Sequence, residues 1–382
     1  MSERPARILL LYTGGTIGMD GQPLAPMSVG RFAARLDQLP GFGDSLLRLR
    51  SLNGEIQEVH YTLDALAEPI DSSSMAPQDW VAVARRILSR YEEFDGFVVV
   101  HGTDTMAWTA SALAFLLEGL ARPIVVTGSQ LPLSHPRSDG PRNLVTAMEL
   151  AATTSIPEVG LFFDMSLYRG CRASKVSTST FGGFASPNYP PLATAGIAID
   201  VREALVRLPP PAEASLESEA HRRRVAARLD AIERALPEFS VLSMVLFPGI
   251  QASNAIDVLL RSTEPPVLGL VLQAFGEGNA PATPRFLHAL QQAHERGVVI
   301  VDGTQVVQGE VNVDAYASAR GLEHAGAISG FDMTPQAAQA KLIYLLALGL
   351  TQANVETLMQ RNMRGELRAV PGVAQGLVFE DA

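Results

Sequence analysis

Short apolar runs recur through the first half of the chain, and several of them lead into segments with apolar residues at helical spacing. Such runs predict buried strands, and the helical spacing predicts helices that cover them. The predicted strands are Ile8–Tyr12, Glu58–Leu63, Phe94–Val100, Pro123–Val126 and Val159–Phe163. The predicted helices are Phe32–Leu39, the segment whose first turn holds Pro77, Met106–Leu117 and Asn143–Thr153. This alternation predicts an α/β fold with a mostly parallel sheet.

The pattern is interrupted at Leu208–Pro211, where prolines follow one another. Residues 213–236 are rich in Ala, Arg and Glu, which predicts a charged helix whose run Arg222–Arg224 forms a solvated face. The pattern resumes with strands at Val241–Phe247, Val267–Leu272 and Val298–Val301 and helices at Asn254–Arg261, Pro284–Arg296 and Pro335–Leu348. We therefore expect a larger domain over residues 1–207, a charged linker over 208–239 and a smaller α/β domain over 240–382.

Polar clusters follow several predicted strands. They are Thr13–Gly18 (TGGTIG), His101–Thr105 (HGTDT), Thr127–Gln130 (TGSQ, with Ser129) and Asp164. Each cluster alone has a structural explanation, because glycines form tight turns and Asp104 or Thr105 would suit a helix cap. Parallel strands end at one edge of a sheet, however, and four such clusters together indicate a shared ligand pocket.

Two further polar stretches have open interpretations. Ser72 and Ser73 precede a helix and are typical either of a cap or of hydroxyl ligands for a polar substrate. The stretch Leu167–Ala193 is dense in small polar residues, and a long irregular loop of this kind is usually functional. Met19–Val29, rich in Gly, Pro and Met, predicts a mobile loop.

The totals narrow the class of protein. The net charge of −10 argues against a nucleic-acid or anionic-membrane surface. The single cysteine, Cys171, excludes an internal disulfide framework. The first apolar run is too short for a signal peptide, and no run approaches the ~18 apolar residues of a membrane helix. We expect a cytoplasmic enzyme or binding protein.

Lysine is scarce, since Lys175 and Lys341 are the only lysines and the other basic residues are arginines. Lysine can give up its proton in a protein, whereas arginine cannot. Lys341 lies in a predicted helix, where packing is a sufficient explanation. Lys175 lies in the polar stretch and is the better chemical candidate.

Two threonines on glycine turns, an acid and this lysine indicate a hydrolase with an activated hydroxyl. Threonine attacks only when a base removes its proton, and a neutral lysine oriented by a carboxylate can serve. Thr16, Thr103, Asp104 and Lys175 are therefore the catalytic candidates. His101 is another possible base, although a strand-end histidine more often packs beside its neighbours. His, Cys and Asp do not cluster at metal-ligand spacing, so we expect neither a metal nor a cofactor.

These motifs, with SDGPRNL at 138–144, resemble the asparaginase/glutaminase family over nearly the whole chain. LYRGCR, FASPNYPPL and GNAP are similar to its bacterial cytoplasmic type I members. The resemblance implies a larger α/β domain and a smaller flavodoxin-like one, with L-asparagine as the substrate. It also implies homodimers or tetramers with no nucleic-acid or membrane partner.

The resemblance also assigns roles to residues. Thr16 matches the threonine that attacks the side-chain amide to form a β-aspartyl ester. Thr103, Asp104 and Lys175 match the set that transfers protons and activates water. Asp104, Ser72 and Ser73 match positions that hold the substrate's amino and carboxylate groups, and we add Ser129 to the substrate-binding candidates. Asn279 of GNAP would be lent by a neighbouring subunit.

Two departures from the family pattern change what we expect. The loop over residues 21–26 lacks the tyrosine that members carry near the nucleophile. The stretch 272–275 lacks the arginine of the effector site found in some type I enzymes, so we do not expect allostery. The alternatives are a hydrolase of another amide or ester, such as L-glutamine or a lysophospholipid, and a non-catalytic amino-acid-binding module.

Overall fold

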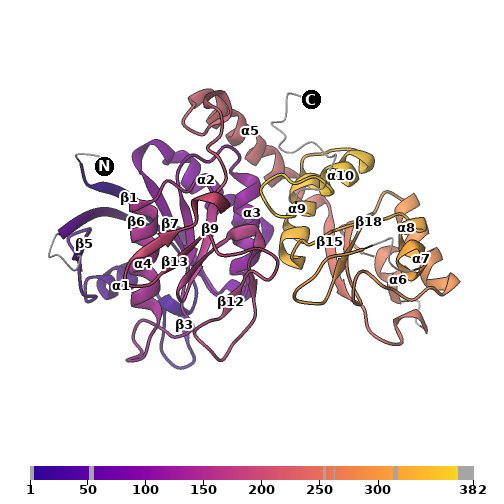
Figure 1. Cartoon of the computed structure of the whole chain (residues 1–382), viewed down its shortest axis with the longest axis horizontal. Coiled ribbons are helices and arrows are strands. Elements are labelled where there is room, and N and C mark those ends of the chain that lie inside the picture. Colours follow the sequence, from indigo (N-terminus) through magenta and orange to yellow (C-terminus); the bar gives the residue numbers. More distant parts are fainter. Residues whose placement is uncertain (1–3, 51–55, 253–254, 262, 313–316, 369–382) are drawn as a thin grey trace. The chain divides into compact units, whose positions relative to one another are not determined.

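The computed structural model describes residues 4–50, 56–252, 255–261, 263–312 and 317–368 (Figure 1). The chain divides into two compact units, Met1–Ala226 and Ala227–Ala382. Each unit is built on a sheet with parallel strands and carries helices, which confirms the predicted α/β class. Within the described residues, no helix combines the length and the apolar character that crossing a bilayer requires.

A ten-stranded sheet forms the larger unit, in the order β14-β13-β10-β9-β8-β7-β1-β6-β5-β4. The central strands run parallel and the outer ones antiparallel. The parallel strands are β1 (Ala6–Gly14), β6 (Ile56–Ile70), β7 (Gly96–Val100), β8 (Ile124–Thr127) and β9 (Val159–Phe163). The outer strands are β4 (Phe42–Gly43), β5 (Leu46–Arg50), β10 (Ser166–Arg169), β13 (Ala193–Ala195) and β14 (Ile199–Val201). Two small hairpins pair β2 (Met19–Asp20) with β3 (Ala25–Pro26) and β11 (Ser174–Lys175) with β12 (Phe184–Ala185).

The strand order indicates where a ligand would bind. β6 and β7 lie on opposite sides of β1, so the direction of winding reverses at β1. In open α/β sheets, ligands bind outside the carboxyl ends of the strands at such a reversal. Here the carboxyl ends of β1 and β7 lead directly into TGGTIG and HGTDT.

Helices bury the sheet. Leu144 and Met148 of α4 (Gly140–Thr153) join the alternate residues Ile8 and Leu10 of β1 in one core, as the two-residue period of a strand requires. α3 (Met106–Leu116) is buried on nearly all sides, which explains its almost continuous apolar sequence. The other helices that begin in this unit are α1 (Val29–Leu36), α2 (Pro77–Ser89) and α5 (Glu219–Ala235).

Some elements differ from the predictions. The helix predicted at Phe32–Leu39 begins earlier, at Val29. β6 extends to Ile70, far beyond the strand predicted at Glu58–Leu63. The loop predicted at Met19–Val29 contains the β2–β3 hairpin, whose base is held by the backbone hydrogen bond from Met27 to Gly18. The irregular stretch predicted at Leu167–Ala193 is interrupted by the short strands β11 and β12.

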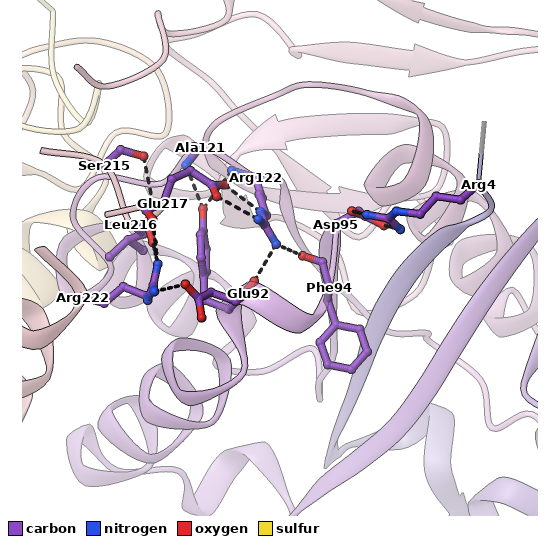
Figure 2. A network of polar contacts seen from close by, with 11 residues as sticks. Arg4, Glu92, Phe94, Asp95, Ala121, Arg122, Ser215, Leu216, Glu217 and Arg222 are labelled. Atoms are coloured by element: carbon purple, nitrogen blue, oxygen red, sulfur yellow. Dashed lines mark hydrogen bonds and ion pairs between the residues drawn. The ribbon is translucent and has the colours of Figure 1, made fainter. Parts of the chain in front are cut away.

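The charged segment over 213–236 is tied to the larger unit by the polar network in Figure 2. Arg122 donates to the Glu217 carboxylate at 2.7 Å and lies over the ring of Tyr91. Arg222 pairs with Glu92 and donates to the Leu216 carbonyl at 2.6 Å. The prediction of a solvated face is therefore wrong for Arg222, whose side chain is mostly buried because it caps this turn, whereas Arg223 is exposed.

The smaller unit holds a four-stranded parallel sheet in the consecutive order β15-β16-β17-β18. Its strands are β15 (Ser240–Val245), β16 (Val267–Ala274), β17 (Val299–Thr304) and β18 (Ala327–Ser329). Its helices are α6 (Ala255–Arg261), α7 (Pro284–Glu295), α8 (Ala317–His324), α9 (Pro335–Ala347) and α10 (Gln352–Met359). Asn254, the first residue of a predicted helix, lies outside the described residues. These four strands do not reverse their order, unlike those of the larger unit.

Candidate active site

The turns that follow β1, β6 and β7 are in close contact where the direction of winding reverses. A Cβ atom on Gly15 would lie 2.2 Å from the backbone nitrogen of Gly102, and one on Gly102 would lie 2.3 Å from Ser72 Oγ. Gly15 also has a φ of 86°, which L side chains rarely adopt. Only glycine allows this approach. Thr16 follows Gly15 and Thr103 follows Gly102 in the sequence, so the close contact of the two glycines brings both threonine motifs to one junction.

Lys175 links the predicted second set of residues. Its Nζ donates to Thr103 Oγ1 at 2.8 Å and to Asp104 Oδ1 at 2.7 Å. The Lys175 side chain is 17% exposed and that of Asp104 60%. A hydroxyl within hydrogen-bond reach of an amine and a carboxylate beside that amine are what proton transfer to or from the hydroxyl needs.

Thr16 begins a short 3-10 helix over Thr16–Gly18 and is partly exposed. The preceding turn is fixed by Thr13, whose hydroxyl donates to the Val100 carbonyl at 2.9 Å and so ties the end of β1 to that of β7. The predicted nucleophile thus follows a closely packed, hydrogen-bonded turn and is itself partly exposed.

Capping does not explain HGTDT. Thr105 occupies the N-cap position of α3, yet its side chain makes no capping hydrogen bond. Its hydroxyl donates instead to the Ser72 carbonyl at 2.8 Å, and Asp104 pairs with Lys175. Both polar side chains therefore hold the site together rather than the helix.

The serines do not cap the helix that follows them, because the N-cap position of α2 is Ala76. Asp71 caps the 3-10 helix over Ser72–Ser74, accepting from the Ser73 nitrogen and from Ser73 Oγ. Ser72 is buried against Gly102, whereas Ser73 is exposed with its hydroxyl on Asp71. Ser72 is thus the serine brought into contact with the glycine junction.

Ser129 is buried, and its hydroxyl donates to the Leu131 carbonyl at 2.5 Å. This contact closes the loop after β8 and favours a structural role for the side chain.

The neighbouring Gln130 was not singled out in the sequence, although it belongs to the TGSQ cluster. Its side-chain nitrogen donates to the carbonyls of Ser177 and Thr180, holding the loop that follows Lys175.

The Nε2 atom of His101 contacts Thr109 and Met75. Its ring is fully buried, and burial lowers its pKa to about 4. A neutral histidine in these contacts agrees with packing beside its neighbours rather than with the role of a base.

Within the described part of the chain, His, Cys, Asp and Glu form no group of three or more suited to a metal ion.

The remaining predicted residues lie in the smaller unit. Asn279 lies in the turn after β16, where its backbone exchanges hydrogen bonds with Phe275. Lys341 is fully buried, and its Nζ donates to Glu366 Oε1 at 2.5 Å. Packing alone is therefore not the explanation for Lys341, because its charge neutralises a buried carboxylate.

The chain is similar to known proteins along both units. Residues 7–207 match the family described as Asparaginase, N-terminal, and residues 241–359 match the Glutaminase/Asparaginase C-terminal domain. L-asparaginase 1 of Escherichia coli K12 is 41% identical over 94% of this chain and 97% of its own length. The 60 kDa lysophospholipase of Homo sapiens is 40% identical over 94% of this chain, which spans 61% of that protein. The crystal structure of L-asparaginase I from Vibrio cholerae has a TM-score of 0.76 and 37% identity, covering 96% of this chain and 100% of that one.

Proposed function

We propose that this chain, which belongs to the asparaginase family, hydrolyses L-asparagine to L-aspartate and ammonia. The observation that carries the proposal is the pair of hydrogen bonds from Lys175 to Thr103 and Asp104 beside the Gly15–Gly102 junction. A similarity in sequence alone would fit a binding module, but a lysine bonded to a threonine hydroxyl also provides a path for protons.

In this mechanism Thr16 Oγ1 attacks the carbon of the side-chain amide and loses its proton. That proton leaves on the amine, so ammonia departs and a β-aspartyl ester remains on Thr16. A water molecule then attacks the ester, and Lys175 with Thr103 takes up and returns its proton, which regenerates the Thr16 hydroxyl. The Lys175–Thr103 hydrogen bond supports this second step, and backbone N–H groups of the glycine turns would stabilise the oxyanion.

Substrate recognition follows from the groups around the nucleophile. Asp104 remains 60% exposed despite its bond to Lys175, so its carboxylate can also accept from the substrate's α-ammonium group. Ser72 and Ser73 would hold the α-carboxylate. For Ser129 we propose contact through the backbone of its loop, since the hydroxyl is already bonded to Leu131.

We propose that the protein assembles as a homodimer or homotetramer in the cytoplasm, with Asn279 completing the site of a second copy. Exposed apolar side chains gather near the Asn279 turn, at the carboxyl edge of the small sheet, which supports an interface there. They are Val245, Phe247, Val306 and Val307, each between 48% and 65% exposed. Gln305 joins their segments by donating to the Leu246 carbonyl. Light scattering measures the molar mass in solution and so tests the proposed oligomer. A fully active monomer would refute the proposal.

A substrate panel tests the proposed activity. Ammonia release should be fastest from L-asparagine and slower from L-glutamine, and fatty-acid release from lysophosphatidylcholine should be absent. The curve against L-asparagine concentration should be hyperbolic, because the stretch 272–275 offers no arginine for an effector. Binding of L-asparagine without ammonia release would instead establish the amino-acid-binding module, and faster fatty-acid release would establish an esterase.

A further inference from the structure

His101 lies between the buried strand β7 and the site, and the mechanism above does not use it. Its ring is fully buried, with Nδ1 2.7 Å from the carbonyl oxygen of Gly102. On the other side of the ring, Nε2 lies 2.8 Å from Thr109 Oγ1 and 2.9 Å from Met75 Sδ. Both ring nitrogens are therefore within hydrogen-bonding distance of the protein.

These contacts determine the tautomer. The Gly102 carbonyl oxygen and Met75 Sδ can both only accept, and the carbonyl is the stronger acceptor at the shorter distance, 2.7 Å against 2.9 Å, so the proton lies on Nδ1. Burial keeps the ring neutral at neutral pH, which leaves Nε2 without a proton. Thr109 Oγ1 is then the donor to Nε2, a shorter contact than its 3.3 Å approach to Met75 Sδ.

The Gly102 carbonyl determines where Thr103 stands. In a planar trans peptide the carbonyl and the following N–H point in opposite directions, so holding one fixes the other. Gly102 has no side chain to restrict its own dihedral angles. A ring that holds this peptide therefore also fixes the backbone of Thr103, whose hydroxyl receives the hydrogen bond from Lys175.

We propose that His101 is a positioning residue, whose Nδ1–H holds the Gly102–Thr103 peptide so that the Thr103 hydroxyl stays bonded to Lys175. The inference rests on the proposed amidohydrolase function. His101 exchanges no proton with the substrate. Its contribution is a fixed distance between Thr103 and Lys175, and so it belongs to the rate of the chemical steps rather than to substrate binding.

Two substitutions distinguish the contribution of Nδ1 from that of Nε2. Asparagine places an amide nitrogen where Nδ1 stands, and glutamine places one where Nε2 stands. His101→Asn should keep kcat for L-asparagine within a few-fold of wild type. His101→Gln should lower kcat by about 100-fold, the cost of misplacing a catalytic group by about 1 Å. KM should stay nearly unchanged in both, and His60→Gln, exposed on β6, is the matched control.

Equal activity of the Asn and Gln variants, or a loss confined to KM, would overturn the proposal. A thermal melt of each variant separates misfolding from misplacement. Long-range nitrogen–proton NMR of the wild-type protein reads the tautomer without reference to activity or to any variant. Protonated Nδ1 supports the proposal and protonated Nε2 refutes it. A wild type inactive on L-asparagine but protonated on Nδ1 would refute the proposed function alone.

Discussion

At the scale of single residues, the scarcity of lysine indicated a chemical role for Lys175 rather than mere packing. Its Nζ donates hydrogen bonds to Thr103 and Asp104. The same reasoning was incomplete for Lys341, because its partner Glu366 lies beyond the helix that holds it. Burial raises the pKa of Glu366, but Lys341 and nearby backbone N–H groups outweigh it, and the pKa is lowered overall. A partner distant in sequence cannot be inferred from periodicity.

Asp302 is another buried carboxyl, and no cation among the described residues forms an ion pair with it. It is 2% exposed within β17, its Oδ1 makes no hydrogen bond with the described residues, and the Gly278 turn covers Oδ2. Burial raises its pKa to about 8. The sequence Asp302-Gly303-Thr304 is similar to the first-unit motifs, but its carboxyl is buried and closed off.

We expect Asp302→Asn to stabilise the protein above neutral pH. The folded pKa lies above the unfolded value of about 3.9, so wild-type stability falls by about 1.4 kcal/mol per pH unit between the two values. The neutral asparagine removes this dependence. Calorimetry at pH 5 and pH 8 should show a larger drop in the melting temperature for wild type than for the variant. Equal drops would mean that Asp302 is ionised in the folded protein.

At the scale of elements, the apolar runs predicted the central strands well, since burial on both faces makes them continuous. The end of β6 was missed because Asp64, Glu68 and Pro69 break the apolar pattern there. A register shift against β1 nevertheless lets it reach Gly14. The β2–β3 hairpin was missed because its base is held by Tyr12, whose hydroxyl lies 2.9 Å from the Gly18 carbonyl and 3.2 Å from that of Met27.

We expect Tyr12→Phe to loosen this hairpin without unfolding the unit. Burial raises the Tyr12 pKa to about 12, so the hydroxyl remains a donor at neutral pH. The variant keeps the stacking on Phe32, at 4.1 Å between ring centroids, and loses only the hydrogen bonds. Proteolysis within residues 21–26 should quicken several-fold while the melting temperature falls only slightly. Unchanged proteolysis would show that other contacts hold the hairpin.

At the scale of the whole molecule, the sequence predicted the α/β class and the convergence of the threonine motifs. The topology explains why: the reversal of winding at β1 makes the ends of β1 and β7 neighbours. The closeness of that contact was not predictable, because it depends on Gly15, Gly102 and Ser72 from three separate strand ends. The polar anchoring of the charged segment by Arg122 and Arg222 was also hidden, since their partners are far away in sequence.

In the proposed mechanism Thr16 attacks the amide while Thr103 and Lys175 transfer protons. The most direct test measures ammonia release from L-asparagine by Thr16→Ala and Thr103→Val, with Thr153→Ala on the exposed end of α4 as the control. We expect both site variants to lose at least about 1000-fold in kcat, as removal of a nucleophile or its proton-transfer partner does, while the control keeps wild-type activity. Near wild-type ammonia release by Thr16→Ala would refute this mechanism.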